Sequence, residues 1–104
     1  MSESRLKSLE NDALFEAILK LETEEECYRF FEDICTISEL KSIAHRLAVA
    51  KLLRENVTYQ DISAQLGAST ATISRVNRAL TYGTGGYGIV LDRLVEGSPE
   101  GKEP

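Results

Sequence analysis

The stretch from Thr58 to Leu80, TYQDISAQLGASTATISRVNRAL, predicts two short helices joined by a tight turn. Apolar residues at helical spacing mark the inward face of each helix: Ile62 and Leu66 in the first, and Ile73, Val76 and Leu80 in the second. Gly67 lies at the bend, as often happens in the three- to four-residue turn of a helix-turn-helix. We therefore expect a helix-turn-helix at about residues 58–82.

The second of these helices has a polar outer face. The face consists of Thr70, Thr72, Ser74, Arg75, Asn77 and Arg78. Hydroxyl groups near the helix start can bond base edges in the major groove, and Ser69 or Thr70 with the free backbone amides there suits a DNA phosphate. No carboxylate lies between Ala68 and Arg78 to repel phosphates. These features favour double-stranded DNA as the partner; the alternative is a helical hairpin that binds another protein.

The remaining apolar spacing predicts four further helices and no strand, so the fold class is all-α with six helices. The expected helices span about residues 6–21, 23–35, 38–56, 58–67, 69–82 and 87–95. Thr23 with Glu26 and Thr36 with Glu39 have the S/T-x-x-E pattern of a capped helix start. The polar sequence at the end predicts a disordered tail over 97–104, which leaves residues 1–96 as a single domain.

In the second half of the helix at 38–56, apolar side chains lie on nearly every side of the helix. They are Val49, Ala50, Leu52 and Leu53. A chain of 104 residues buries only about two-thirds of the surface that it exposes when unfolded. Covering every side of a central helix therefore calls for a second copy of the chain. We expect a homodimer.

Composition narrows the class of protein. The chain is 42% hydrophobic and 28% charged, which is typical of a folded globular domain. It has no apolar run long enough to span a membrane and no secretory signal, so we expect a cytoplasmic protein with no membrane partner.

The net charge of -5 is unevenly distributed along the chain. Residues 41–82 hold six basic and two acidic side chains, a net charge of +4. This basic segment contains the predicted helix-turn-helix and could contact DNA locally.

Neither catalysis nor metal binding is predicted. His45 is the only histidine, and no motif pairs it with a Cys, Asp or Ser. Cys27 and Cys35 lie on the apolar face of the helix at 23–35, so we expect buried, reduced thiols. No Cys/His spacing suits a metal, and we expect no enzyme activity, no metal and no required cofactor.

Residues 37–83, ISELKSIAHRLAVAKLLRENVTYQDISAQLGASTATISRVNRALTYG, resemble the DNA-binding half of the Trp repressor family. The whole chain resembles the family's YerC/YecD-type members. This resemblance implies a six-helix, Trp-repressor-like fold and an intertwined homodimer. It further implies a transcriptional regulator, most simply a repressor, that binds a palindromic operator.

The resemblance also assigns roles to individual residues. Gln60 and Ser63 match positions that contact the DNA backbone, whereas Thr70, Ala71, Thr72 and Ser74 match positions that face bases and phosphates. Arg75 matches an arginine that packs on the corepressor tryptophan, and with Ser69 and Arg78 it completes the expected DNA-binding set.

An effector pocket is implied at His45, Arg46, Arg75 and Ala79. The family's best-known member has an arginine where His45 stands and a serine where Ala79 stands. An imidazole and a methyl group cannot replace the bidentate guanidinium and the hydroxyl that hold an amino acid. We therefore do not expect tryptophan to be the effector.

Overall fold

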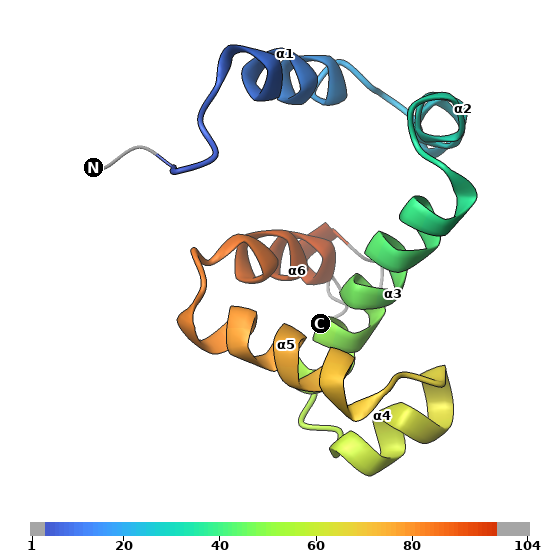
Figure 1. The fold of residues 1–104 in the computed structure, drawn as a ribbon, viewed down its shortest axis with the longest axis vertical. Coiled ribbons are helices and arrows are strands. Elements are labelled where there is room, and N and C mark those ends of the chain that lie inside the picture. Colours follow the sequence, from blue (N-terminus) through green and yellow to red (C-terminus); the bar gives the residue numbers. More distant parts are fainter. Residues whose placement is uncertain (1–3, 98–104) are drawn as a thin grey trace. The chain divides into compact units, whose positions relative to one another are not determined.

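The computed structural model describes residues 4–97, which form six α-helices and, over that range, no β-strand (Figure 1). The helices are α1 (Leu9–Ile18), α2 (Glu24–Ile34), α3 (Ile37–Arg54), α4 (Tyr59–Leu66), α5 (Thr70–Tyr82) and α6 (Gly86–Gly97). The all-α, six-helix prediction is confirmed. The tail predicted at 97–104 lies outside the described residues, apart from Gly97 at the end of α6.

The described residues fall into two units, 4–40 and 41–97, which we call the N-terminal unit and the C-terminal unit. The boundary falls within α3, after Leu40. The N-terminal unit contains α1, α2 and the first turn of α3. The C-terminal unit contains the rest of α3 with α4, α5 and α6, and it holds every residue of the helix-turn-helix prediction.

Side-chain caps start α2 and α3 where the sequence predicts them. Thr36 and Glu39 cap α3 reciprocally: the Thr36 Oγ1 accepts the Glu39 N–H at 3.0 Å, and a Glu39 carboxylate oxygen accepts the Thr36 N–H at 2.8 Å. At α2 the Thr23 Oγ1 accepts the Glu26 N–H at 3.0 Å. Each cap satisfies amide groups that a helix start leaves free.

The first helix is shorter than its apolar spacing predicts. The Ser8 Oγ accepts the Asn11 N–H at 3.0 Å, so α1 begins after this cap and leaves Leu6 outside the helix. At the other end, Leu21 donates its N–H to the Ile18 carbonyl three residues back, which belongs to a turn rather than to an α-helix. The apolar pattern continues past both ends because it does not itself fix a helix boundary.

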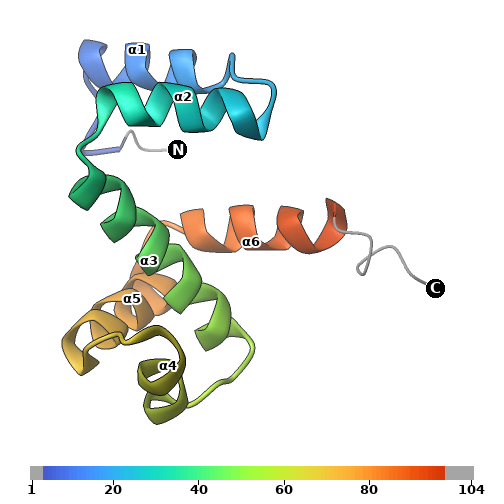
Figure 2. The same cartoon turned by 90° about the vertical axis from the view of Figure 1, so that its right-hand side faces the viewer.

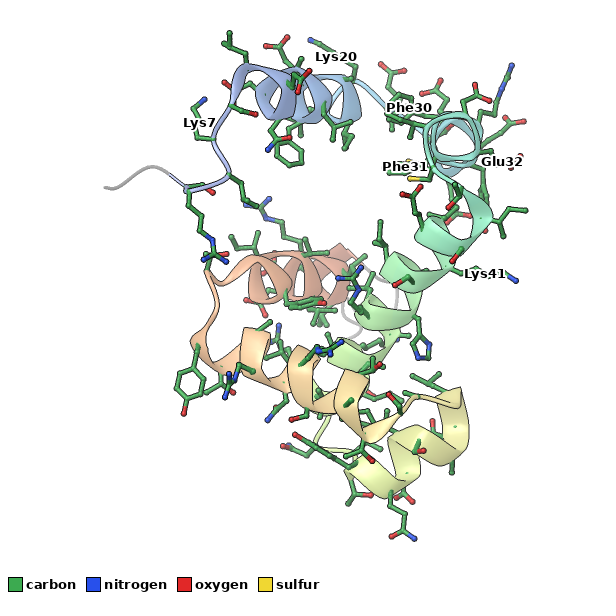
Figure 3. All side chains as sticks on the ribbon, viewed as in Figure 1. Lys7, Lys20, Phe30, Phe31, Glu32 and Lys41 are labelled. Atoms are coloured by element: carbon green, nitrogen blue, oxygen red, sulfur yellow. The ribbon has the colours of Figure 1, made fainter. Side chains whose placement is uncertain are left out.

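The N-terminal unit has no buried side chain among its described residues. Phe30 and Phe31 of α2 make an edge-to-face contact with ring centroids 5.4 Å apart (Figure 3). Cys27 and Cys35, which we expected to be buried, are half-buried free thiols. Two helices of 10 and 11 residues present too little surface to enclose a core.

The C-terminal unit contains the hydrophobic core. Its buried residues come from all four helices and the turn between α4 and α5: Val49, Ala50, Ile62, Ala68, Ile73, Val76 and Leu91. Figures 1 and 2 both place α4 and α5 beside the C-terminal half of α3. Partly buried Leu66 and Leu80 pack against this core, so all five inward-facing residues predicted for the helix-turn-helix are buried or half-buried.

One side of α3 stays open to solvent in the single chain. Val49 and Ala50 are fully buried, whereas Ile43 is 50% exposed and Leu47 is 37% exposed. The helix ends at Arg54, because Asn56 adopts a left-handed conformation and the Val57 N–H donates to the Leu52 carbonyl at 3.0 Å. Ile43 and Leu47 on this open side are among the apolar residues of α3 that a second chain could cover.

Candidate functional site

The C-terminal unit contains a helix-turn-helix. The helices α4 and α5 are joined by a turn of three residues, 67–69. Gly67 takes a left-handed φ of 68° and donates its N–H to the Ser63 carbonyl at 2.8 Å, which ends α4. Ala68 in the turn is buried, as are Ile62 of α4 and Ile73 of α5. The packed turn fixes how α5 is presented to a partner.

Ser69, and not Thr70, is the residue that caps α5. The Ser69 Oγ accepts the Thr72 N–H and donates to the Thr72 Oγ1, both at 3.1 Å. The first turn of α5 contains no acidic residue. Backbone amides at such a helix start attract anions, and hydroxyl groups beside them add further hydrogen bonds.

The residues expected to contact DNA lie on the surface of α4, the turn and α5. Gln60, Ser63, Ser69, Thr70, Ala71, Ser74, Arg75 and Arg78 are exposed, and Thr72 is half-buried. Arg75 and Arg78 have no hydrogen-bond or ion-pair partner within residues 4–97. Residues 62–91 contain no Asp or Glu, so these two guanidinium groups give that segment a positive charge.

A cavity of about 440 Å³ lies next to the helix-turn-helix, within the C-terminal unit. Its lining comes from α3, α5 and α6: Ser42, His45, Arg46, Thr72, Arg75, Val76, Ala79 and Tyr87. The structure thus brings together all four residues of the expected effector pocket. No carboxylate lines the cavity, so its charged side chains are the two arginines.

Half of the lining residues were not expected there. Ser42 lies one helical turn before His45 and Arg46, and Val76 lies one turn before Ala79, so helical spacing could have identified both. Tyr87 follows a glycine-rich connector and carries no such signal. Thr72 was expected at the DNA surface, and it also lines the cavity.

Arg54 of α3 fixes the segment of α6 that carries Tyr87. The Arg54 Nη2 forms an ion pair with the Asp92 Oδ1 at 2.6 Å, and its Nη1 donates to the Gly88 carbonyl at 3.4 Å. Leu91, between these two contacts, is buried in the core. The wall of the cavity on α6 is therefore held by the Arg54 contacts and by the packing of Leu91 and Tyr87 in the core.

Tryptophan, the corepressor of the family's best-known member, can be compared with the polar groups that line this cavity. The Arg46 Nε donates to the Ser42 carbonyl of its own helix at 3.4 Å, and Arg46 is therefore turned back along α3. His45 is half-buried, and Ala79 offers only a methyl group. The resemblance implies a guanidinium and a hydroxyl at these two positions, and neither His45 nor Ala79 supplies one, so these two positions do not fit tryptophan.

Within residues 4–97, neither a metal-binding cluster nor a membrane-spanning helix occurs. Over residues 4–97, no group of three or more His, Cys, Asp or Glu side chains could hold a metal ion. No helix in that range is long and apolar enough to cross a membrane.

Similar proteins place the chain in a family. The family model described as Trp repressor protein matches residues 9–95. A Bacillus subtilis (strain 168) protein, the uncharacterized YerC, is 53% identical over 100 residues, which cover 96% of each chain.

Two crystal structures are also similar. A TrpR-like protein from Eubacterium eligens ATCC 27750 is 56% identical with a TM-score of 0.83, covering 86% of this chain and 93% of its own. A Staphylococcus aureus protein described as a candidate Trp repressor is 50% identical with a TM-score of 0.83, covering 86% and 90%. The matches confirm the Trp-repressor-like fold and the YerC-type resemblance, and the chain belongs to the Trp repressor family.

Proposed function

We propose that the protein is a sequence-specific DNA-binding transcriptional regulator, a repressor that acts in the cytoplasm on a palindromic operator. The observation that carries this proposal is the surface of α5. It combines exposed hydroxyls and two arginines that have no partner within residues 4–97 with a 30-residue segment, 62–91, that lacks carboxylates. Membership of the Trp repressor family supports a regulator over an enzyme. Residues 1–96 act together as one DNA-binding domain.

The DNA contacts divide into two kinds. Base edges are contacted from the start of α5 by Thr70, Ala71 and Thr72. Phosphates are held by Gln60 and Ser63 of α4 and by Ser69, Ser74, Arg75 and Arg78 of the turn and α5. Phosphate contacts position the protein and supply salt-dependent affinity, whereas the base contacts supply sequence preference.

A homodimer presents two such surfaces to the two halves of the operator. The open side of α3, with Ile43 and Leu47, and the absence of any buried side chain in residues 4–40 support this assembly. A monomer would leave these apolar surfaces in water, at about 25 cal/mol for each Å² that a partner could cover. The two chains intertwine, because the uncovered surface belongs to the N-terminal unit as well as to α3.

The cavity beside α5 is the effector pocket. With two arginines, a histidine and no carboxylate in its lining, it suits an anionic small molecule other than tryptophan. An effector there would touch Thr72 and Arg75, which also belong to the DNA surface. DNA binding itself does not depend on tryptophan.

One selection experiment tests the main proposal. The full chain is incubated with random duplexes, and the bound duplexes are sequenced. The affinity for the selected site is then measured at salt concentrations from about 50 to about 200 mM. We expect a palindromic consensus and a steep fall in affinity with salt. A helical module that binds only protein would select no sequence.

A further inference from the structure

Arg75 lines the cavity beside α5 and is also exposed on the surface of that helix. It has no hydrogen-bond or ion-pair partner within residues 4–97. A guanidinium carries five N–H donors, so all five donors of Arg75 are open to a molecule from outside the described chain. The cavity and the surface expected to contact DNA therefore share one cationic group.

The positive charge of the cavity has no counter-charge in the lining. Arg46 and Arg75 both line the cavity, and no Asp or Glu does. The Arg46 Nε donates to the Ser42 carbonyl at 3.4 Å, which leaves the two terminal amino groups of this guanidinium available. Two like charges on one small cavity repel each other, and an anion bound there would relieve that repulsion.

The rest of the lining indicates what kind of anion fits. Val76 and Ala79 of α5 and Tyr87 of α6 contribute apolar surface that could pack against the carbon atoms of a ligand. The volume of about 440 Å³ is in the ordinary range of small-molecule pockets. Guanidinium groups bind carboxylates and phosphates through paired N–H donors. The lining thus suits a small organic anion with two or more negative charges, a polycarboxylate or a phosphate monoester.

We propose that a small organic anion bound in this cavity releases the protein from DNA, so that the effector is an inducer and not a corepressor. This inference rests on the proposed function, in which Arg75 holds a DNA phosphate. The anion would occupy donors of Arg75 that the phosphate needs. Two anions on one guanidinium also lie within about 8 Å of each other, the screening length at physiological ionic strength, so they repel. Anion and DNA therefore each lower the affinity for the other.

The test measures the affinity of the full chain for its selected duplex in the presence of citrate or of phenyl phosphate. Each probe is used at about 10 mM, without divalent cations, against sodium chloride at the same total ionic strength of about 150 mM. Citrate offers carboxylates and phenyl phosphate offers a phosphate monoester, so the two probes distinguish the two ligand chemistries. We expect at least one probe to weaken DNA binding about threefold or more, as competition at millimolar affinity does. Calorimetry without DNA should show the same probe binding to the chain.

Two matched variants locate the effect, Arg46→Gln and Arg78→Gln. Each removes one positive charge from an exposed side chain, so both variants should fold. Arg46 lines the cavity, whereas Arg78 belongs to the expected DNA surface and does not line the cavity. The readout is the ratio of DNA affinities without and with the probe, taken for each variant separately. We expect Arg46→Gln to bring this ratio close to one, and Arg78→Gln to keep the wild-type ratio at a lower DNA affinity.

The inference is overturned if neither probe weakens DNA binding at matched ionic strength, or if a probe strengthens it. It is also overturned if both variants keep the wild-type ratio, because the probe would then act on the DNA surface in general and not through the cavity. A wild type that selects no duplex overturns the proposed function, and this inference falls with it. A wild type that binds its duplex equally well with and without both probes overturns this inference alone.

Discussion

Arg54 on α3 is paired with Asp92 on α6, 38 residues further along the chain, at 2.6 Å between Nη2 and Oδ1. The same guanidinium donates to the Gly88 carbonyl, next to the cavity residue Tyr87. The pair is partly open to solvent, with side chains 39% and 58% exposed. The ion pair therefore contributes more to the orientation of α6 against α3 than to the free energy of folding.

We expect Arg54→Ala to lower the free energy of unfolding by about 1 kcal/mol or less, because exposed ion pairs contribute little. Asp92→Asn is the matched variant of similar shape, and its effect should be similar and should shrink in high salt. Urea unfolding of both variants and of the double variant measures the coupling. A loss of several kcal/mol would mean that the pair is shielded in the assembled protein.

Gly67→Ala should destabilise the helix-turn-helix through the backbone alone. The left-handed φ of 68° disfavours a Cβ, although no atom lies within 4 Å of one built there. The expected cost is about 1–2 kcal/mol, and Gly67→Asn should cost less because asparagine tolerates this conformation. Urea unfolding distinguishes the two variants. Equal stability of wild type and Gly67→Ala would show that this turn conformation is not maintained in solution.

Leu47→Glu tests the dimer. In a monomer, a side chain with 37% exposure could turn a carboxylate to water at small cost. In a dimer core it would bury an unpaired charge, which costs several kcal/mol. We expect the wild type to sediment at twice the chain mass at low micromolar concentration, with an unfolding midpoint that rises with concentration.

The Leu47→Glu chain should lose the dimer and its folded structure together. Gln65→Glu, an exposed substitution on α4 that adds the same charge, should keep the wild-type mass. A folded wild-type monomer at this concentration would contradict the intertwined assembly.

Arg78→Ala should weaken binding to all duplexes by a similar factor. Its guanidinium is exposed, has no partner among the described residues and lies two turns beyond the start of α5, so we expect a phosphate contact. The slope of log affinity against log salt should fall by about 1 for each site. Arg93→Ala on α6 is the control and should leave the slope unchanged. A changed consensus in Arg78→Ala would instead assign this arginine to a base.

Tryptophan should have little effect on operator binding. Losing a charge-assisted contact to a carboxylate costs about 1.5–3 kcal/mol, or one to two decades in affinity, and His45 cannot make the bidentate contact of an arginine. We expect 1 mM L-tryptophan, about the weak end of ordinary ligand affinity, to strengthen binding by less than about threefold. A titration of the selected duplex with and without tryptophan decides this. A tenfold gain would mean that Arg46 or Arg75 supplies the missing contact.

Much of the helix-turn-helix could be predicted from residues close together in the chain. A cap such as Ser69 acts on an amide three residues away, and Gly67 ends its helix through a carbonyl four residues back. Local pattern also located the inward-facing Ile62 and Ile73. The local pattern gave the wrong bounds for α1, because apolar residues at helical spacing continue beyond both ends of the helix, which starts at the Ser8 cap. It failed again at the cysteines, because burial depends on what lies opposite a helix face.

The sequence by itself determined the starts of α2, α3 and α4, the turn, and the hydroxyl-rich, carboxylate-free surface of α5, since these depend on side chains within one or two helical turns. Only the tertiary structure decided that Thr72 lines a cavity with His45 and Tyr87, and that Arg54 holds α6 beside it. Such contacts join residues 15 to 42 positions apart in the chain. No periodic pattern encodes them, because they arise only when the helices pack around a shared core.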